Sequence, residues 1–171
     1  MRLIDRPESM SAPEHWPGIT LLAATVFLEA ESEPEAGQLA VAFNPCNRSR
    51  INNWELHRSI LGRDLKAYGD GLPYEIYSCW NDDYQRAAQY RLTQMPDLTW
   101  HYFYKLAVAA WWDYLKDPGN GSYFYLNAEL TRQLRPAGDL PGWWATDTDP
   151  ASEVVIGKHT FRRRRTLISK N

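Results

Sequence analysis

The chain has 171 residues, of which 44% are hydrophobic and 23% charged, and its 19 Lys and Arg nearly balance 21 Asp and Glu. A chain of this size and composition can bury one sizeable core, so disorder and collagen-like repetition are excluded. A basic excess of the kind that dedicated nucleic-acid binders carry is missing, and we expect no nucleic-acid partner. Aromatic residues make up 13% of the chain, which suits either a Trp-rich core or a recognition surface.

The chain is predicted to form one domain with two short flanking segments. Prolines and a lack of periodicity predict an irregular N-terminal arm over 1–18, followed by a single domain over 19–165 and a C-terminal tail over 166–171. The arm has no apolar run of the secretory type, and no stretch is long enough to span a membrane. We therefore expect a protein made in the cytoplasm, without stable membrane insertion, and monomeric because no periodicity indicates an oligomer.

The first elements of the domain are predicted to be helices. Apolar residues recur at helical spacing over about 20–31 and again from about 33 to 42. Ser32 and Glu35 fit a capping box at the start of the second helix. Pro45 is expected to limit that helix, because proline lacks the backbone N–H that a helix interior needs.

The middle of the chain continues this helical pattern. Residues 54–61 favour a short helix, and 74–81 favour an extended segment. Two longer helices follow, from about 82 to 95 and from about 97 to 116. The last of these is apolar almost all round, which is typical of a buried helix, and we expect it to be the central one.

The end of the chain is predicted to contain the β-structure. Segments 122–127 and 153–163 are rich in β-forming residues, and the Pro- and Gly-rich stretch 136–150 between them is typical of a loop. Helices first and short strands late indicate an α+β fold, with a mainly helical body and a small late β-hairpin or sheet.

Four glutamates alternate across the break between the first two predicted helices: Glu29, Glu31, Glu33 and Glu35. Glu29 falls in the last helical turn, where the negative end of the helix dipole disfavours ionisation, so it could serve as a general acid. Glu33 precedes Pro34, which keeps it out of the helical conformation and lets it point back toward Glu29 or its surroundings. From spacing alone, a solvated acidic turn accounts for the same run.

Five segments carry a resemblance to one known family, in that family's order: 28–38 with 47–48, 77–81, 117–121, 125–127 and 156–161. The first resembles the acidic signature of the SleB-type cell wall hydrolases, a family of spore cortex-lytic enzymes. The second is similar to its aromatic-Ser-x-Trp-Asn segment, and the last to its closing Ile-Gly-x-His-x-Phe. The resemblance spans about residues 20–162.

The resemblance implies a lysozyme-like α+β domain that cleaves peptidoglycan glycan strands between N-acetylmuramic acid and N-acetylglucosamine. Glu29 matches the family's catalytic glutamate and would act as general acid and then general base. We favour a lytic transglycosylase, for which one carboxylate is enough. A hydrolytic muramidase would use Glu33 as the second carboxylate. No cofactor is expected, and the scattered histidines lack the spacing of a metal site.

Two further functional classes stay open. Leu28 and Ser32 stand where the family commonly has small residues, and Pro45 interrupts a usually apolar helical stretch. A catalytically inactive peptidoglycan-binding or virion structural protein would tolerate such changes. An amidase that cuts the peptide stem usually needs zinc ligands, which the sequence does not supply. The lack of a signal suits a phage endolysin that is released to act in the periplasm or cell wall.

Sugar rings pack on aromatic planes, so a glycan site would use the aromatic surplus. The candidate substrate-binding residues are Tyr77, Ser78, Trp80, Tyr125, Asn127, Trp144 and His159. Core packing explains Trp80 and Tyr125 equally well, and Asn127 suits a turn equally well. The basic run 162–165 fits either a solvated tail or attraction to an anionic polymer. Cys46 and Cys79 are expected to be free thiols.

Overall fold

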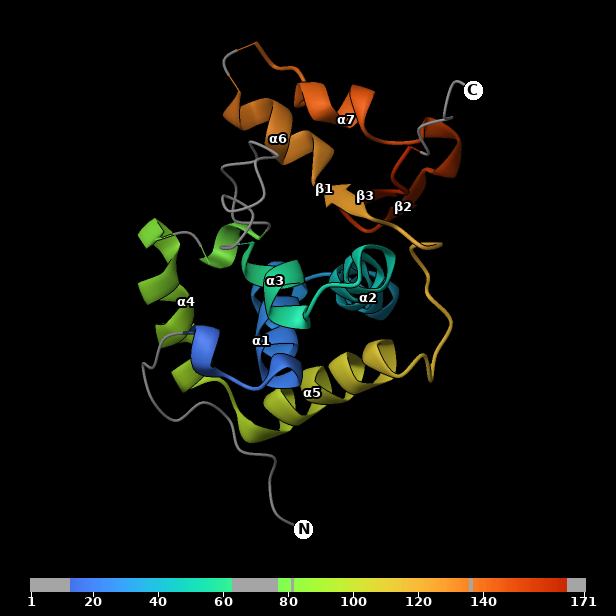
Figure 1. Ribbon diagram of the computed structural model, residues 1–171. Helices are drawn as coiled ribbons and strands as arrows, with labels where there is room; N and C mark the ends of the chain where they lie inside the picture. Colours follow the sequence, from blue (N-terminus) through green and yellow to red (C-terminus); the bar gives the residue numbers. More distant parts are fainter. Residues whose placement is uncertain (1–12, 63–76, 81, 136, 166–171) are drawn as a thin grey trace.

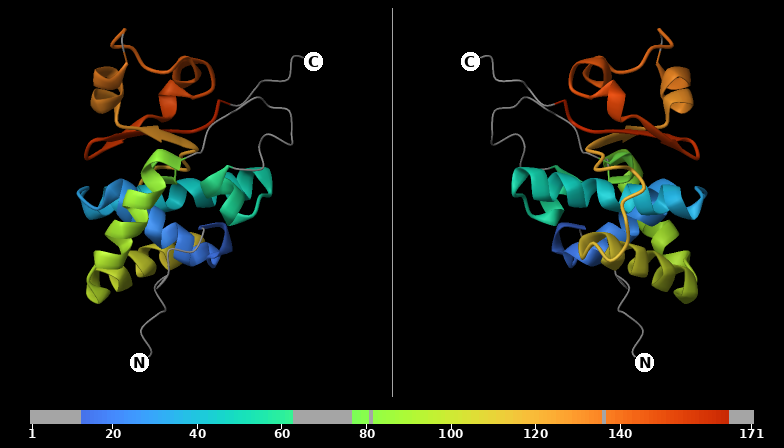
Figure 2. Two further views of the ribbon diagram at one scale, coloured as in Figure 1. Left: turned by 90° about the vertical axis from the view of Figure 1, so that its left-hand side faces the viewer. Right: turned by 90° about the vertical axis from the view of Figure 1, so that its right-hand side faces the viewer.

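The structure is a computed structural model that describes residues 13–62, 77–80, 82–135 and 137–165. It has an α+β fold, in which a helical body built early in the chain carries a small antiparallel sheet built late (Figure 1). Figure 2 shows these two parts as layers, with the sheet and the helices that follow its first strand on one side of the helical body. The predicted α+β class, with a mainly helical body and a small sheet late in the chain, is confirmed.

The helical body is formed by α1 (Gly18–Ala30), α2 (Glu35–Asn52), α3 (Leu56–Leu61), α4 (Asp82–Gln94) and α5 (Asp97–Trp111). Helix α1 lies at its centre, because every residue from 20 to 27 is buried and α2, α3 and α5 all pack against it. Small residues such as Ala23 and Ala24 are fully buried in α1 and let the neighbouring helices approach closely. The central helix is therefore the first one of the domain.

Helix α5 was expected to be central and to run to about residue 116, and both expectations are wrong. It ends at Trp111, and Asp113 adopts a left-handed conformation with φ 54°. Arg50 of α2 donates to the carbonyl oxygens of Ala110 and Trp111, which closes the helix end. Only one face of α5 is buried, and the apolar side chains beyond its end are exposed: Trp112, Tyr114 and Leu115.

Helix α2 continues through Pro45 to Asn52, so the prediction that Pro45 limits it is wrong. Pro45 has no N–H to donate to the Val41 carbonyl, a loss that costs about 3 kcal/mol in an isolated helix. Burial of almost the whole helix from 37 to 49 offsets this loss. The expected capping box is also not formed, because α2 begins after Pro34 and no side chain caps its first turn.

The sheet has three short antiparallel strands, β1 (Phe124–Leu126), β2 (Val154–Ile156) and β3 (His159–Arg162). Their order is β1-β3-β2, so the last strand is the middle one, and Tyr125 of β1 lies opposite Phe161 of β3. The predicted β-segments are confirmed. Between β1 and β2 the chain forms α6 (Ala128–Leu134), which the sequence did not predict, and α7 (Gly142–Thr146), which lies inside the expected loop.

Polar side chains of α2 fasten the sheet to the helical body. The Asn47 side chain donates to Asp117 Oδ2 at 2.9 Å and to the Ser122 carbonyl at 3.0 Å. Arg48 Nε donates to the Tyr123 carbonyl at 2.7 Å. Because Ser122 and Tyr123 directly precede β1, these bonds set where the first strand starts relative to α2.

Two expectations near the core need correction. Residues 77–80 do not form part of an extended segment, because the 3-10 helix η3 (Ser78–Trp80) lies there; residues 74–76 and 81 lie outside the described residues. Trp16, expected in the irregular arm, is buried and meets Trp80 edge to face at 5.7 Å between ring centroids. The core therefore includes a side chain that precedes residue 19.

We predict that Thr25→Val lowers the free energy of unfolding by about 1–3 kcal/mol. Trp80 Nε1 donates to Thr25 Oγ1 at 2.9 Å, and both groups are buried, so the valine leaves an indole N–H without an acceptor. Urea denaturation measures the change. Thr93→Val is the matched control, because Thr93 sits on the surface of α4, and it should shift stability by less than about 0.5 kcal/mol. Equal shifts would contradict the prediction.

Candidate active site

Glu29 lies in the last turn of α1, where the helical body meets the sheet, and its side chain is held from two sides. The backbone N–H of Cys79, in η3, donates to Glu29 Oε1 at 3.0 Å. The Tyr125 hydroxyl, from β1, donates to Glu29 Oε2 at 3.1 Å. Glu29 is half-buried, so these two donors orient its carboxyl group while part of the residue stays exposed.

Aromatic contacts hold Tyr125 in this position. Its ring stacks on Phe161 with 5.5 Å between centroids and meets the edge of His159 at 5.1 Å. On another side it packs on Tyr77 at 5.9 Å. Burial raises the pKa of the Tyr125 hydroxyl well above its ordinary value, and the negative charge of Glu29 acts in the same direction. The hydroxyl therefore stays protonated and keeps donating to Glu29.

Glu33 connects the break between α1 and α2 to the turn between β2 and β3. Its side chain is only 3% exposed, and its Oε2 accepts a hydrogen bond from the Lys158 backbone N–H at 2.9 Å. Gly157, just before this amide, has φ 58°, and a Cβ added there would overlap Glu33 Oε2. Only glycine combines this backbone conformation with the close approach of the carboxylate.

His159, on β3, lies beside Glu33. Burial lowers the pKa of its imidazole, while the negative charges of Glu33 and Glu29 oppose that effect. Its Nδ1 lies 3.6 Å from Glu33 Oε1 and has no hydrogen-bond partner among the described residues. The lowered pKa favours the neutral form of the imidazole, and the ring packs against Tyr125.

Two of the aromatic candidates for substrate binding, Tyr77 and Trp80, are buried in the core. Trp80 is fully buried and Tyr77 is 1% exposed, so neither offers its ring to a ligand in this conformation. The Tyr77 hydroxyl donates to Asn44 Oδ1 at 3.0 Å, and the Tyr77 ring packs against the Tyr125 ring. Ser78 contributes its backbone to η3, and its side chain lies outside the described residues.

The remaining candidates lie on the sheet side. Asn127 is half-buried and caps α6, because its Oδ1 accepts from the Leu130 N–H at 3.0 Å. Trp144 is buried beneath the guanidinium of Arg162, which lies 4.6 Å from the ring centroid. Arg162 itself ends β3 and pairs with Glu153, so the basic run begins inside the sheet.

Two elements of the site were missed by sequence reasoning. The Cys79 amide leaves no signal, because any residue supplies a backbone N–H. Gly157 did leave one, since a glycine between two β-forming stretches indicates a turn with positive φ. Neither feature predicts that the turn meets Glu33.

The described residues offer neither a metal centre nor a membrane span. Among them, no three His, Cys, Asp or Glu side chains group together in a way that could hold a metal ion. None of the described helices is both long and apolar enough to cross a bilayer.

Comparisons of the chain with family models, with curated proteins and with solved structures found no match. The geometry of the site and the resemblance of the motifs therefore carry the functional argument.

We predict that Gly157→Ala is more destabilising than Gly138→Ala. Both glycines have positive φ, 58° and 65°, so each substitution incurs the same backbone strain of about 1 kcal/mol. Only at Gly157 would the new Cβ overlap Glu33 Oε2, whereas nothing lies within 4 Å at Gly138. The excess should be about 1–3 kcal/mol in urea denaturation, because the Glu33 bond must break or shift. Equal losses would show that Glu33 does not hold the turn.

We also predict that both cysteines of the native protein resist alkylation. Burial raises the pKa of Cys46 to about 12, and burial together with the charge of Glu29 raises that of Cys79 well above its ordinary value. Since the thiolate is the reactive form, iodoacetamide at pH 8 should label the native protein at least about 100-fold more slowly than the urea-unfolded protein. Mass spectrometry gives both rates. Rapid labelling of native Cys79 would contradict this environment.

Proposed function

We propose that this protein cleaves the glycan strands of peptidoglycan between N-acetylmuramic acid and N-acetylglucosamine, as a lytic transglycosylase with a lysozyme-like arrangement. One observation carries the proposal. The half-buried Glu29 carboxyl group lies between the helical body and the sheet, with each oxygen held by its own donor, Cys79 N–H or Tyr125 O–H. The motif resemblance assigns the catalytic role to this same residue.

The reaction needs one group that first gives and then takes a proton. Glu29 protonates the glycosidic oxygen, so that the bond to the anomeric carbon breaks and N-acetylglucosamine leaves with a free hydroxyl group. The carboxylate formed then accepts the proton of the muramic acid 6-hydroxyl, whose oxygen bonds to the anomeric carbon. The product is a 1,6-anhydro end, no water is consumed, and Glu29 returns to its starting state.

The surroundings of Glu33 favour this one-carboxylate chemistry over hydrolysis. A hydrolase needs a second carboxylate that reaches the sugar or a water molecule beside it. Glu33 is almost fully buried and accepts the hydrogen bond of the Lys158 amide. Using it as nucleophile or base would require breaking the connection to the β2–β3 turn, so we assign it a structural role.

We predict that Glu29→Gln abolishes the release of soluble fragments from purified peptidoglycan. Glutamine is nearly isosteric but cannot give or take the proton, a contribution of about 10²–10⁴-fold in rate. Mass spectrometry of the fragments measures both yield and product type. Glu35→Gln is the matched control, because Glu35 is an exposed glutamate of the same acidic run and should leave the fragments unchanged.

The product type separates the alternatives. Anhydromuramic ends made by the wild type, and lost in Glu29→Gln, support the transglycosylase. Reducing ends would instead require a hydrolase. If neither protein releases fragments but both bind the wall, the chain is a peptidoglycan-binding or structural protein and the proposal fails.

A further inference from the structure

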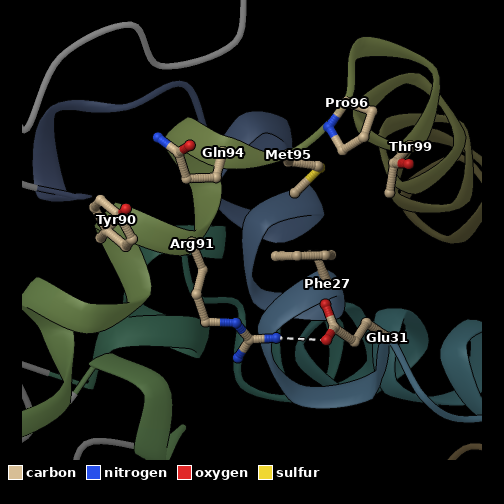
Figure 3. A pocket seen from close by; sticks show the side chains of 8 residues that line it. All are labelled: Phe27, Glu31, Tyr90, Arg91, Gln94, Met95, Pro96 and Thr99. Atoms are coloured by element: carbon tan, nitrogen blue, oxygen red, sulfur yellow. Dashed lines mark ion pairs between the residues drawn. The ribbon is translucent and has the colours of Figure 1, made fainter.

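A hollow of about 310 Å³ lies beside the end of α1, between α1, α4 and α5 (Figure 3). Its walls are mostly apolar, with Phe27 from α1 and Met95 and Pro96 from the link between α4 and α5. Two charged side chains cross it: Arg91 reaches from α4 toward Glu31 at the end of α1, as Figure 3 shows. The hollow therefore combines an apolar wall with one charge of each sign.

The two charges remain available to a ligand. Arg91 Nη2 lies 2.8 Å from Glu31 Oε1, yet the side chains are 45% and 44% exposed. An ion pair this exposed contributes only about 0–1 kcal/mol to stability, so a ligand that offers both charges can replace it at little cost. The Arg91 guanidinium also lies over the Phe27 ring at 5.2 Å, which keeps it in place when the pair opens.

This hollow lies at the same end of α1 as the candidate active site. Glu31 is two residues from Glu29, and the Arg91 helix begins at Asp82, just after η3. Burial and the charge of Glu29 raise the pKa of the Cys79 thiol, and the positive charge of Arg91 partly opposes them. The charge of Arg91 thus acts on the residue whose amide binds Glu29. A branched ligand bound at Glu29 would reach the hollow by passing around the end of α1.

We propose that this hollow binds the charged end of the peptide stem that muramic acid carries, so that the enzyme recognises peptide-bearing glycan. The inference rests on the proposed function. A stem ends in a carboxylate and commonly carries the free amino group of a diamino acid, and these charges complement Arg91 and Glu31. Its aliphatic side chains fit the wall formed by Phe27 and Met95.

The first experiment compares two substrates that differ only in the stem. Glycan strands with intact stems and the same strands stripped by an amidase are given to the wild type and to Arg91→Gln. The wild type should show kcat/KM about tenfold higher on the stem-bearing strands, and in Arg91→Gln this ratio should fall to about one. Arg135→Gln is the control, because Arg135 forms a similarly exposed pair with Asp139 on the sheet side, and should keep the wild-type ratio.

The second experiment needs no catalysis. Free stem tetrapeptide is titrated into the full chain and followed by calorimetry, with a tetrapeptide of amidated carboxyl groups as comparison. Binding should weaken about tenfold on amidation and in Arg91→Gln, and not in Arg135→Gln. Equal binding by all proteins and peptides, or a wild type that cuts both strands equally, overturns the inference. If the wild type cuts neither strand yet binds the peptide through Arg91, the pocket assignment stands and the proposed cleavage fails.

Discussion

The hydrogen bond from the Lys158 amide to the buried Glu33 carboxylate links the sheet to the helical body. The geometry of the candidate active site depends on this link. It ties the break after α1 to the turn that leads into β3. That strand places Phe161 opposite Tyr125, and Tyr125 donates to Glu29. A short series of contacts thus connects Glu33 to Glu29. Glu33 holds the sheet, and Glu29 accepts a hydrogen bond from a residue that the sheet positions.

The sequence was most informative where local pattern and tertiary packing agree. The helix at α1, the helix at α4 and the two β-rich segments were predicted close to their observed bounds. Pro45 and the end of α5 were not, because burial of α2 outweighs the missing hydrogen bond at Pro45, and because the apolar residues after Trp111 lie on the surface. Local patterns report what a segment can do alone, and packing decided these cases.

The sequence predicted which residues form the candidate site better than it predicted what each of them does. The motif resemblance selected Glu29 and the segments that contain Cys79 and Tyr125, which the structure brings together. The spacing of the glutamates could not separate Glu29, which is half-buried, from Glu33, which is sealed inside. Trp80 is fully buried and therefore belongs to the core and not to a sugar-binding surface. The sequence could not decide this, because a tryptophan suits both environments equally well.

The strand order has a consequence for how the protein matures. The middle strand of the sheet, β3, is also the last strand along the described chain, and it pairs with β1 across an intervening stretch that includes α6 and α7. During synthesis the helical body leaves the ribosome first and can collapse on its own contacts, while Tyr125 has no strand to pair with. Assembly around Glu29 therefore awaits the synthesis of β3, so molecules synthesised only as far as α7 carry the acidic residue without the surface that orients it.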